Sequence, residues 1–104
     1  NGVTTAADNQ EISKYMTVMQ TYPNPITDFT VFYYSVRQSA DVSINIYYIS
    51  GRLVNRLDEG SRTPGVYARQ SSRSELVQVP GTYFYRLELD GKQSLPRKLG
   101  IVQN

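Results

Sequence analysis

The sequence contains no cysteine, no histidine and no tryptophan among its 104 residues. Without cysteine and histidine there is no disulfide, no thiolate nucleophile, no Cys/His zinc site and no Ser-His-Asp triad. Residues 1–14 lack the apolar core of a signal peptide. No apolar run approaches the roughly 20 residues that a membrane-spanning helix needs. Targeting signals are therefore expected elsewhere in a longer parent protein.

An excess of one charge is also lacking. Eleven Lys and Arg stand against nine Asp and Glu, a net charge of +2, which is too small for a strong nucleic-acid field. Most carboxylates fall in predicted turns, where Asp usually caps the backbone. Asp58 and Glu59 are adjacent and suit calcium, but two ligands without a loop template favour a plain turn. We therefore expect a non-enzymatic chain without a metal or cofactor.

Tyrosine is abundant, with nine residues against three phenylalanines. A buried tyrosine hydroxyl needs a hydrogen-bond partner, so many of these rings are expected at core edges with their hydroxyls in water. This composition favours a thin sandwich over a thick core. A chain of this length forms one domain.

The tetrapeptide Tyr22-Pro23-Asn24-Pro25 separates two regions of opposite character. Each proline fixes φ and removes a backbone donor, so neither a helix nor a central strand passes through it. Residues 1–14 are small and polar, which predicts a linker. Residues 15–104 are then expected to form the folded domain.

After this tetrapeptide, β-forming runs follow one another almost to the last residue. Alternation puts Phe32, Tyr34 and Val36 inward and Val31, Tyr33 and Ser35 outward. A half-buried strand is expected to face inward with Val42, Ile44, Ile46 and Tyr48, and outward with Ser43, Asn45 and Tyr47. In the strand at residues 82–89, the residues that share a face are Tyr83, Tyr85, Leu87 and Leu89.

Turn signals divide these runs. Ser50-Gly51 predicts a hairpin, and Asp90-Gly91 predicts a type I′ hairpin. The predicted strands are residues 15–21, 30–36, 42–48, 52–57, 66–68, 76–79, 82–89 and 95–102, whereas most of residues 58–75 reads as loop. The pattern predicts an all-β fold, an immunoglobulin-like antiparallel β-sandwich of about seven strands. A partly open barrel is the structural alternative.

Four motifs occur in a fixed order: Tyr22-Pro23-Asn24-Pro25, then VSINIYYISGR at residues 42–52, GTYFYRL at 81–87 and RKLGIVQ at 97–103. In this order the chain resembles the type A C-terminal sorting domain of type IX secretion system cargo. It is also similar to the immunoglobulin-like domain of flagellar hook-capping proteins. It departs from the sorting pattern in the serine-rich segment 58–75 and at Gly100, where the family usually continues apolar.

The resemblance implies a non-enzymatic sorting signal. Its parent would reach the periplasm, pass an outer-membrane translocon, lose the signal to a sortase that cuts in the linker, and remain at the cell surface or be secreted. The cargo of such signals is commonly joined to anionic lipopolysaccharide. The family-defining positions by matching motif are Pro23, Asn24, Pro25, Gly51, Arg52, Gly81, Tyr83, Lys98 and Val102. Of these, Gly51 and Gly81 are expected in turns, while Lys98 and the last strand are candidates for recognition by β-augmentation.

A second interpretation is a retained module of a secretion-machinery or surface protein that binds anionic lipopolysaccharide or another glycan. Arginine bonds phosphate bidentately and exposed tyrosine stacks on sugars. The candidate surface residues are Arg52, Arg56, Arg62, Arg69, Arg73, Tyr33 and Tyr47. A third interpretation is a structural sandwich with no recognition role. Open edges at the first and last strands also predict a homodimer.

Overall fold

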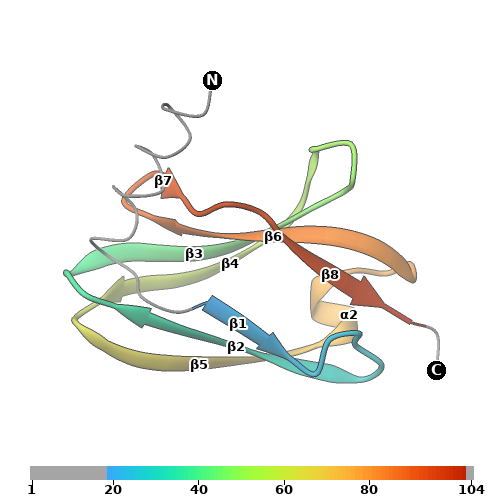
Figure 1. The fold of residues 1–104 in the computed structure, drawn as a ribbon, viewed down its shortest axis with the longest axis horizontal. Helices are drawn as coiled ribbons and strands as arrows, with labels where there is room; N and C mark the ends of the chain where they lie inside the picture. The colour runs from blue at the N-terminus through green and yellow to red at the C-terminus, as the bar shows by residue number, and fades with distance from the viewer. Residues whose placement is uncertain (1–18, 103–104) are drawn as a thin grey trace.

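The computed structural model describes residues 19–102, which form two antiparallel sheets packed face to face (Figure 1). The three-stranded sheet has the order β1-β2-β5, and the five-stranded sheet has the order β4-β3-β6-β7 with β8 also paired to β6. The elements are β1 (Met19–Tyr22), β2 (Phe29–Val36), β3 (Ala40–Tyr47), β4 (Leu53–Arg62), β5 (Gly65–Ser72), α2 (Arg73–Leu76), β6 (Gly81–Leu89), β7 (Lys92–Gln93) and β8 (Arg97–Ile101).

The predicted all-β sandwich is confirmed, with eight strands in the described residues where about seven were expected. Seven of the eight ranges predicted as strands overlap a strand of the structure, and the strand that was not predicted is β7, which has only two residues. The predicted linker at residues 1–14 and the start of the first predicted strand lie outside the described residues.

The core lies between the two sheets, where the alternating side chains of each sheet meet. Phe32 and Tyr34 from β2 are buried, as are Tyr83, Tyr85 and Leu87 from β6. The rings of Phe32 and Tyr85 meet edge to face with centroids 5.5 Å apart. The inward faces predicted for β2 and β6 are therefore confirmed.

The outward face of β3 is more buried than the alternation predicts. Ser43 and Asn45 are each only 2% exposed. They lie on the central strand of the sheet, so the longer side chains of β4 and β6 cover them, and Asn45 donates to Glu88 Oε1 at 3.0 Å. Ser35, also expected outward, is buried as well. Tyr48, expected inward, follows the end of β3 and is 38% exposed.

Segment 58–75 is not the loop that its composition predicts. Strand β4 continues to Arg62, the chain crosses to the other sheet, and β5 pairs with β2 along its whole length. A β-bulge makes this possible: Ser43 pairs with Asp58 and Val42 with Gly60, so Glu59 is the extra residue. Gly60 adopts the left-handed φ of +75° that this bulge requires.

The strand predicted at residues 76–79 is also wrong. Residues Arg73–Leu76 form one helical turn, and the Ser72 hydroxyl caps it by accepting the Glu75 N–H at 3.2 Å. Serine near a helix start satisfies an otherwise unpaired N–H, and this local bond stabilises the turn over extended structure. The predicted type I′ hairpin agrees with Asp90 and Gly91, whose φ angles are +49° and +83°.

Candidate functional site

Residues 24–26, which we call the clamp, bind the outer edge of β8. The Asn24 side-chain amide donates from Nδ2 to the Lys98 carbonyl at 3.0 Å. Its Oδ1 accepts the Gly100 N–H at 2.9 Å. One side-chain amide therefore makes the donor and acceptor pair that a neighbouring peptide group would make in a sheet.

The clamp continues with a short parallel bridge between Ile26 and Ile101. The Ile26 N–H donates to the Gly100 carbonyl at 2.7 Å, and the Val102 N–H donates to the Ile26 carbonyl at 2.9 Å. Ile26 itself is fully buried. The edge of β8 was expected to be open for β-augmentation, but the clamp occupies it from Lys98 to Val102.

Each proline of the Tyr22-Pro23-Asn24-Pro25 motif has a neighbour that fixes its place: Thr30 for Pro23 and Gly100 for Pro25. Thr30, which is fully buried, donates its hydroxyl to the Pro23 carbonyl at 2.8 Å. A Cβ atom on Gly100 would lie 3.4 Å from Pro25 Cβ, which is van der Waals contact. Gly100, the departure from the family pattern, is therefore a position where a larger side chain would meet the clamp.

Another group of family positions meets near the start of β6. Gly51 lies in the turn after β3, and the guanidinium carbon of Arg52 lies 4.9 Å from the centroid of the Tyr48 ring. The Tyr48 ring is in turn 6.0 Å from Tyr83, centroid to centroid. Tyr83 donates its hydroxyl to the Val79 carbonyl at 2.5 Å, and burial raises its pKa. Gly81 is the first residue of β6.

The seven residues of the predicted anionic-glycan surface do not lie together. Tyr33 points outward from β2 and Tyr47 points outward from β3, so they lie on opposite outer faces of the sandwich. Arg52 stacks on Tyr48 in a turn, and Arg73 lies in α2. The structure therefore divides the predicted surface between separate regions.

Three of those arginines have carboxylate partners. Arg56 pairs with Glu88 at 3.6 Å, and Arg69 pairs with Glu59 at 2.7 Å and with Glu75 at 2.6 Å. Arg62 also lies 3.9 Å from Glu59. Their charges are compensated within the domain, which leaves less attraction for an external anion.

Glu59, the bulge residue, lies at the centre of the ion pairs that join the two sheets. Tyr34 donates its hydroxyl to Glu59 Oε1 at 2.8 Å, while Arg69 bonds the other carboxylate oxygen. Burial and the bond to Glu59 raise the pKa of Tyr34 to about 12. The arrangement connects β2, β4 and β5, and it contributes to the fold.

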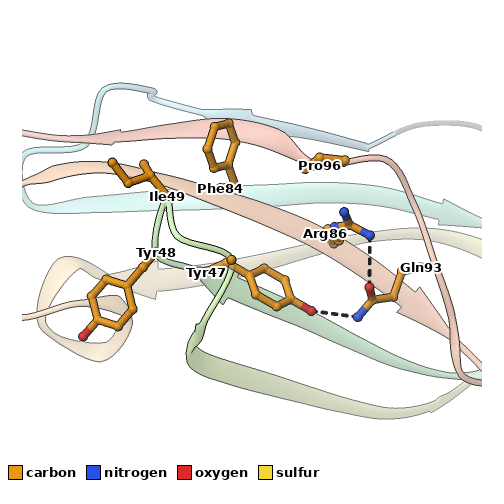
Figure 2. A pocket seen from close by; sticks show the side chains of 8 residues that line it. Tyr47, Tyr48, Ile49, Phe84, Arg86, Gln93 and Pro96 are labelled. Atoms are coloured by element: carbon orange, nitrogen blue, oxygen red, sulfur yellow. Dashed lines mark hydrogen bonds between the residues drawn. The ribbon is translucent and has the colours of Figure 1, made fainter.

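A groove lies on the outer face of the five-stranded sheet (Figure 2). We call it the Tyr47–Phe84 groove; its lining residues are Tyr47, Tyr48, Ile49, Gly51, Phe84, Arg86, Gln93 and Pro96. Of these residues, Tyr47 and Gly51 were predicted as site residues, and the other six were not. Phe84 and Arg86 alternate with the buried Tyr83, Tyr85 and Leu87, so their outward position is readable from the pattern. Gln93 joins the groove only through the register of the last hairpin.

The described residues offer few other kinds of site. Between Met19 and Val102, acidic side chains do not gather into a metal-binding group. No helix in this part of the chain is long and apolar enough to cross a membrane.

The structure defines an all-β sandwich of two antiparallel sheets whose last strand is clamped at its outer edge. The chain belongs to the secretion system C-terminal sorting domain family, whose model matches residues 20–102. It is a type IX secretion signal of cargo proteins, so it interacts with the secretion machinery and directs export across the outer membrane.

A solved structure supports the fold. The chain is similar to part of dimeric latent PorU from Porphyromonas gingivalis, with a TM-score of 0.67 and 23% identity over 83% of this chain. It spans 9% of the length of that protein. No curated protein matches the sequence.

Proposed function

We propose that this domain delivers its parent protein to the cell surface by presenting the side chains of β8 to the outer-membrane translocon. The observation that carries the proposal is the clamp, whose four hydrogen bonds occupy the outer edge of β8. With that edge occupied, a partner contacts the exposed side chains of the strand. Lys98 in β8 and Val102, which directly follows the strand, are both exposed and are the proposed contacts.

This proposal gives the clamp a specific role. An unpaired strand edge pairs readily with any other extended chain. A partner that reads side chains on a covered strand discriminates by charge and shape. The clamp therefore holds the signal in one conformation while the parent crosses the periplasm.

The test is export of a parent protein that ends in this domain. Deleting residues 98–104 is expected to trap the parent in the periplasm, measured by fractionation and by protease treatment of intact cells. Because the deletion removes β8, a Lys98→Ala/Val102→Ala variant tests the surface of a folded domain and is expected to lower surface delivery. Arg73→Ala is the matched control, since Arg73 lies in α2. Normal surface delivery of the truncated parent would contradict the proposal.

We also propose that a sortase removes the domain by cutting in the polar segment 1–14. This segment precedes the folded domain and carries no long apolar run. The new carboxyl terminus of the surface-delivered parent, determined by mass spectrometry, is expected to lie in this segment. A carboxyl terminus within residues 19–102 would contradict the proposal.

The second candidate is a retained module that binds anionic lipopolysaccharide. One observation favours it: Arg52, Arg86, Arg97 and Lys98 have no ion pair within residues 19–102. Intact parent at the cell surface, with this domain attached, would support the second candidate. Complete removal of the domain from the surface-delivered parent would contradict it.

A further inference from the structure

The Tyr47–Phe84 groove has an aromatic floor built by strand register. Tyr47 on β3 is directly opposite Phe84 on β6, and Phe84 is directly opposite Lys98 on β8. Side chains directly opposite each other on one face of a sheet are in contact range. The two aromatic side chains line the groove together with Ile49 and Pro96 (Figure 2). Lys98 lies beside the groove, opposite Phe84 in the sheet.

The polar side of the groove is organised by Gln93. Its side-chain oxygen accepts from Arg86 Nη1 at 3.1 Å, and its Nε2 donates to the Tyr47 hydroxyl at 2.7 Å (Figure 2). Because the Tyr47 oxygen is the acceptor in this bond, the Tyr47 hydrogen is available to a ligand. Arg86 has five N–H donors and uses one terminal nitrogen for Gln93.

Cationic side chains outnumber carboxylates around the groove. Arg86, Arg52 and Lys98 are among the cations without an ion pair in the described part of the chain. The one nearby carboxylate, Glu88, accepts from Asn45 and from the groove residue Gln93 and pairs with Arg56. The groove therefore combines ring faces with uncompensated positive charge, and this favours an amphipathic anion.

We propose that the Tyr47–Phe84 groove binds an acidic polysaccharide. The C–H face of one sugar ring stacks on Tyr47 and Phe84, hydroxyls bond the Tyr47–Gln93 pair, and a carboxylate or phosphate group bonds Arg86 and Lys98. The inference rests on the second candidate above, the retained module, and names the site that it would use.

A saccharide fits this groove better than a peptide does. The backbone groups of β6 are used on both sides, in the ladders with β3 and with β8. An extended peptide lying on the groove finds no main-chain partners, which are the principal source of affinity in strand addition. Ring faces and side-chain donors are what remain, and sugars use both.

The test is titration of the isotope-labelled 104-residue chain with polygalacturonate, followed by nuclear magnetic resonance. Neutral dextran and poly-L-glutamate are the two controls, which separate the sugar ring from the negative charge. We expect shifts of the Tyr47, Phe84, Arg86 and Gln93 signals with polygalacturonate. We also expect affinity to fall as salt rises, since part of the attraction is Coulombic.

Matched variants locate the site. Arg86→Gln is expected to weaken binding about tenfold, as loss of one charge-assisted contact does. Arg73→Gln removes the same charge from α2 and is expected to change the affinity less than about twofold. Lys98→Gln, which removes the charge opposite Phe84 beside the groove, is the second variant, used if circular dichroism finds Arg86→Gln unfolded.

Four outcomes would overturn the inference. Poly-L-glutamate binding as tightly as polygalacturonate would make the site a peptide or a plain charge site. Equal effects of Arg86→Gln and Arg73→Gln, or shifts confined to residues outside the groove, would place binding elsewhere and leave the second candidate standing. If neither polygalacturonate nor anionic lipopolysaccharide binds the chain, both the groove and the second candidate are wrong.

Discussion

The side-chain amide of Asn24 bonds the backbone on both sides of Leu99, accepting from Gly100 and donating to Lys98. Asn24 and Gly100 are 76 positions apart in the sequence, so their hydrogen bond joins the two ends of the described fold. The first family motif, Tyr22-Pro23-Asn24-Pro25, and the last strand, β8, therefore form one structural unit.

Asn24→Ala is expected to destabilise the domain by about 1 to 2 kcal/mol. The substitution removes two side-chain hydrogen bonds, each contributing on the order of 1 kcal/mol net. Both bonds are solvent-exposed, so water replaces part of the loss. Urea unfolding measures the change, with Thr27→Ala, just past the clamp, as the control. Equal stability of Asn24→Ala and the original chain would show that the clamp bonds contribute nothing.

Removing the clamp is also expected to promote self-association. The original chain has edge strands at β1, β4, β5 and the two-residue β7, while the edge of β8 is occupied. Asn24→Ala frees part of the β8 edge, and free edges pair. Light scattering at increasing protein concentration is expected to give a larger mass increase for this variant.

A homodimer of the original chain through its other edges is likewise predicted, and a monomer mass at all concentrations would contradict it.

Substitutions at Gly100 test how much room Pro25 leaves for a side chain on β8. Gly100→Ala is expected to change the free energy of unfolding by less than about 1 kcal/mol, because its Cβ would lie in van der Waals contact with Pro25. Gly100→Val adds two methyl groups at this contact and is expected to cost about 1 to 3 kcal/mol through overpacking. Thermal unfolding of the pair tests this. If valine is tolerated as well as alanine, Pro25 does not restrict this position.

Glu59→Gln is expected to destabilise the domain by about 2 kcal/mol. The substitution keeps the side-chain size and an acceptor for Tyr34 but leaves Arg69 beside a neutral amide, and loss of one partner of a buried pair costs several kcal/mol at most. The Arg69 side chain is 27% exposed, so solvent reduces this cost. Glu75→Gln, at a carboxylate whose side chain is 42% exposed, is the matched control and should cost less than about 1 kcal/mol. If both substitutions lower the free energy of unfolding by similar amounts, the ion pairs of Glu59 contribute no more to stability than an exposed pair does.

The raised pKa of Tyr34 predicts that the domain loses stability at alkaline pH. Burial and the bond to Glu59 raise its pKa from 10.0 to about 12 in the folded chain. The neutral hydroxyl is therefore favoured by folding, so its contribution is complete below pH 10 and is lost as the pH rises toward about 12. The effect is on the order of 2 kcal/mol. Urea unfolding across this range checks it, and Tyr34→Phe should show a shallower decline. An identical decline in both proteins would contradict the assignment.

Local pattern was sufficient for the central strands and for their inward faces. The alternation of Phe32 with Tyr34, and of Tyr83 with Tyr85, depends only on the two-residue period of a strand. The hairpin at Asp90-Gly91 depends on two neighbouring residues that tolerate positive φ. Such signals need no knowledge of the rest of the chain.

Segment 58–75 was misread because its composition resembles a loop. Glycine, serine and proline interrupt it, yet Gly60 serves a bulge and Pro64 lies where the chain crosses between sheets. Whether such residues end a strand or bend it depends on the partners that the strand finds. For Ser43 and Asn45 the predicted outward direction is right, but the expected exposure is wrong. Side chains of the neighbouring strands cover both residues.

The sequence by itself determined the all-β class, the alternating core and the ordered motifs of a sorting domain, since each follows from residue type and short spacing. Only the tertiary structure decided that Asn24 covers the edge of β8, that the seven candidate glycan residues lie apart, and that Tyr47, Phe84, Arg86 and Gln93 share a groove. These relationships depend on which strands become neighbours, and that choice is set by packing between residues far apart in the chain.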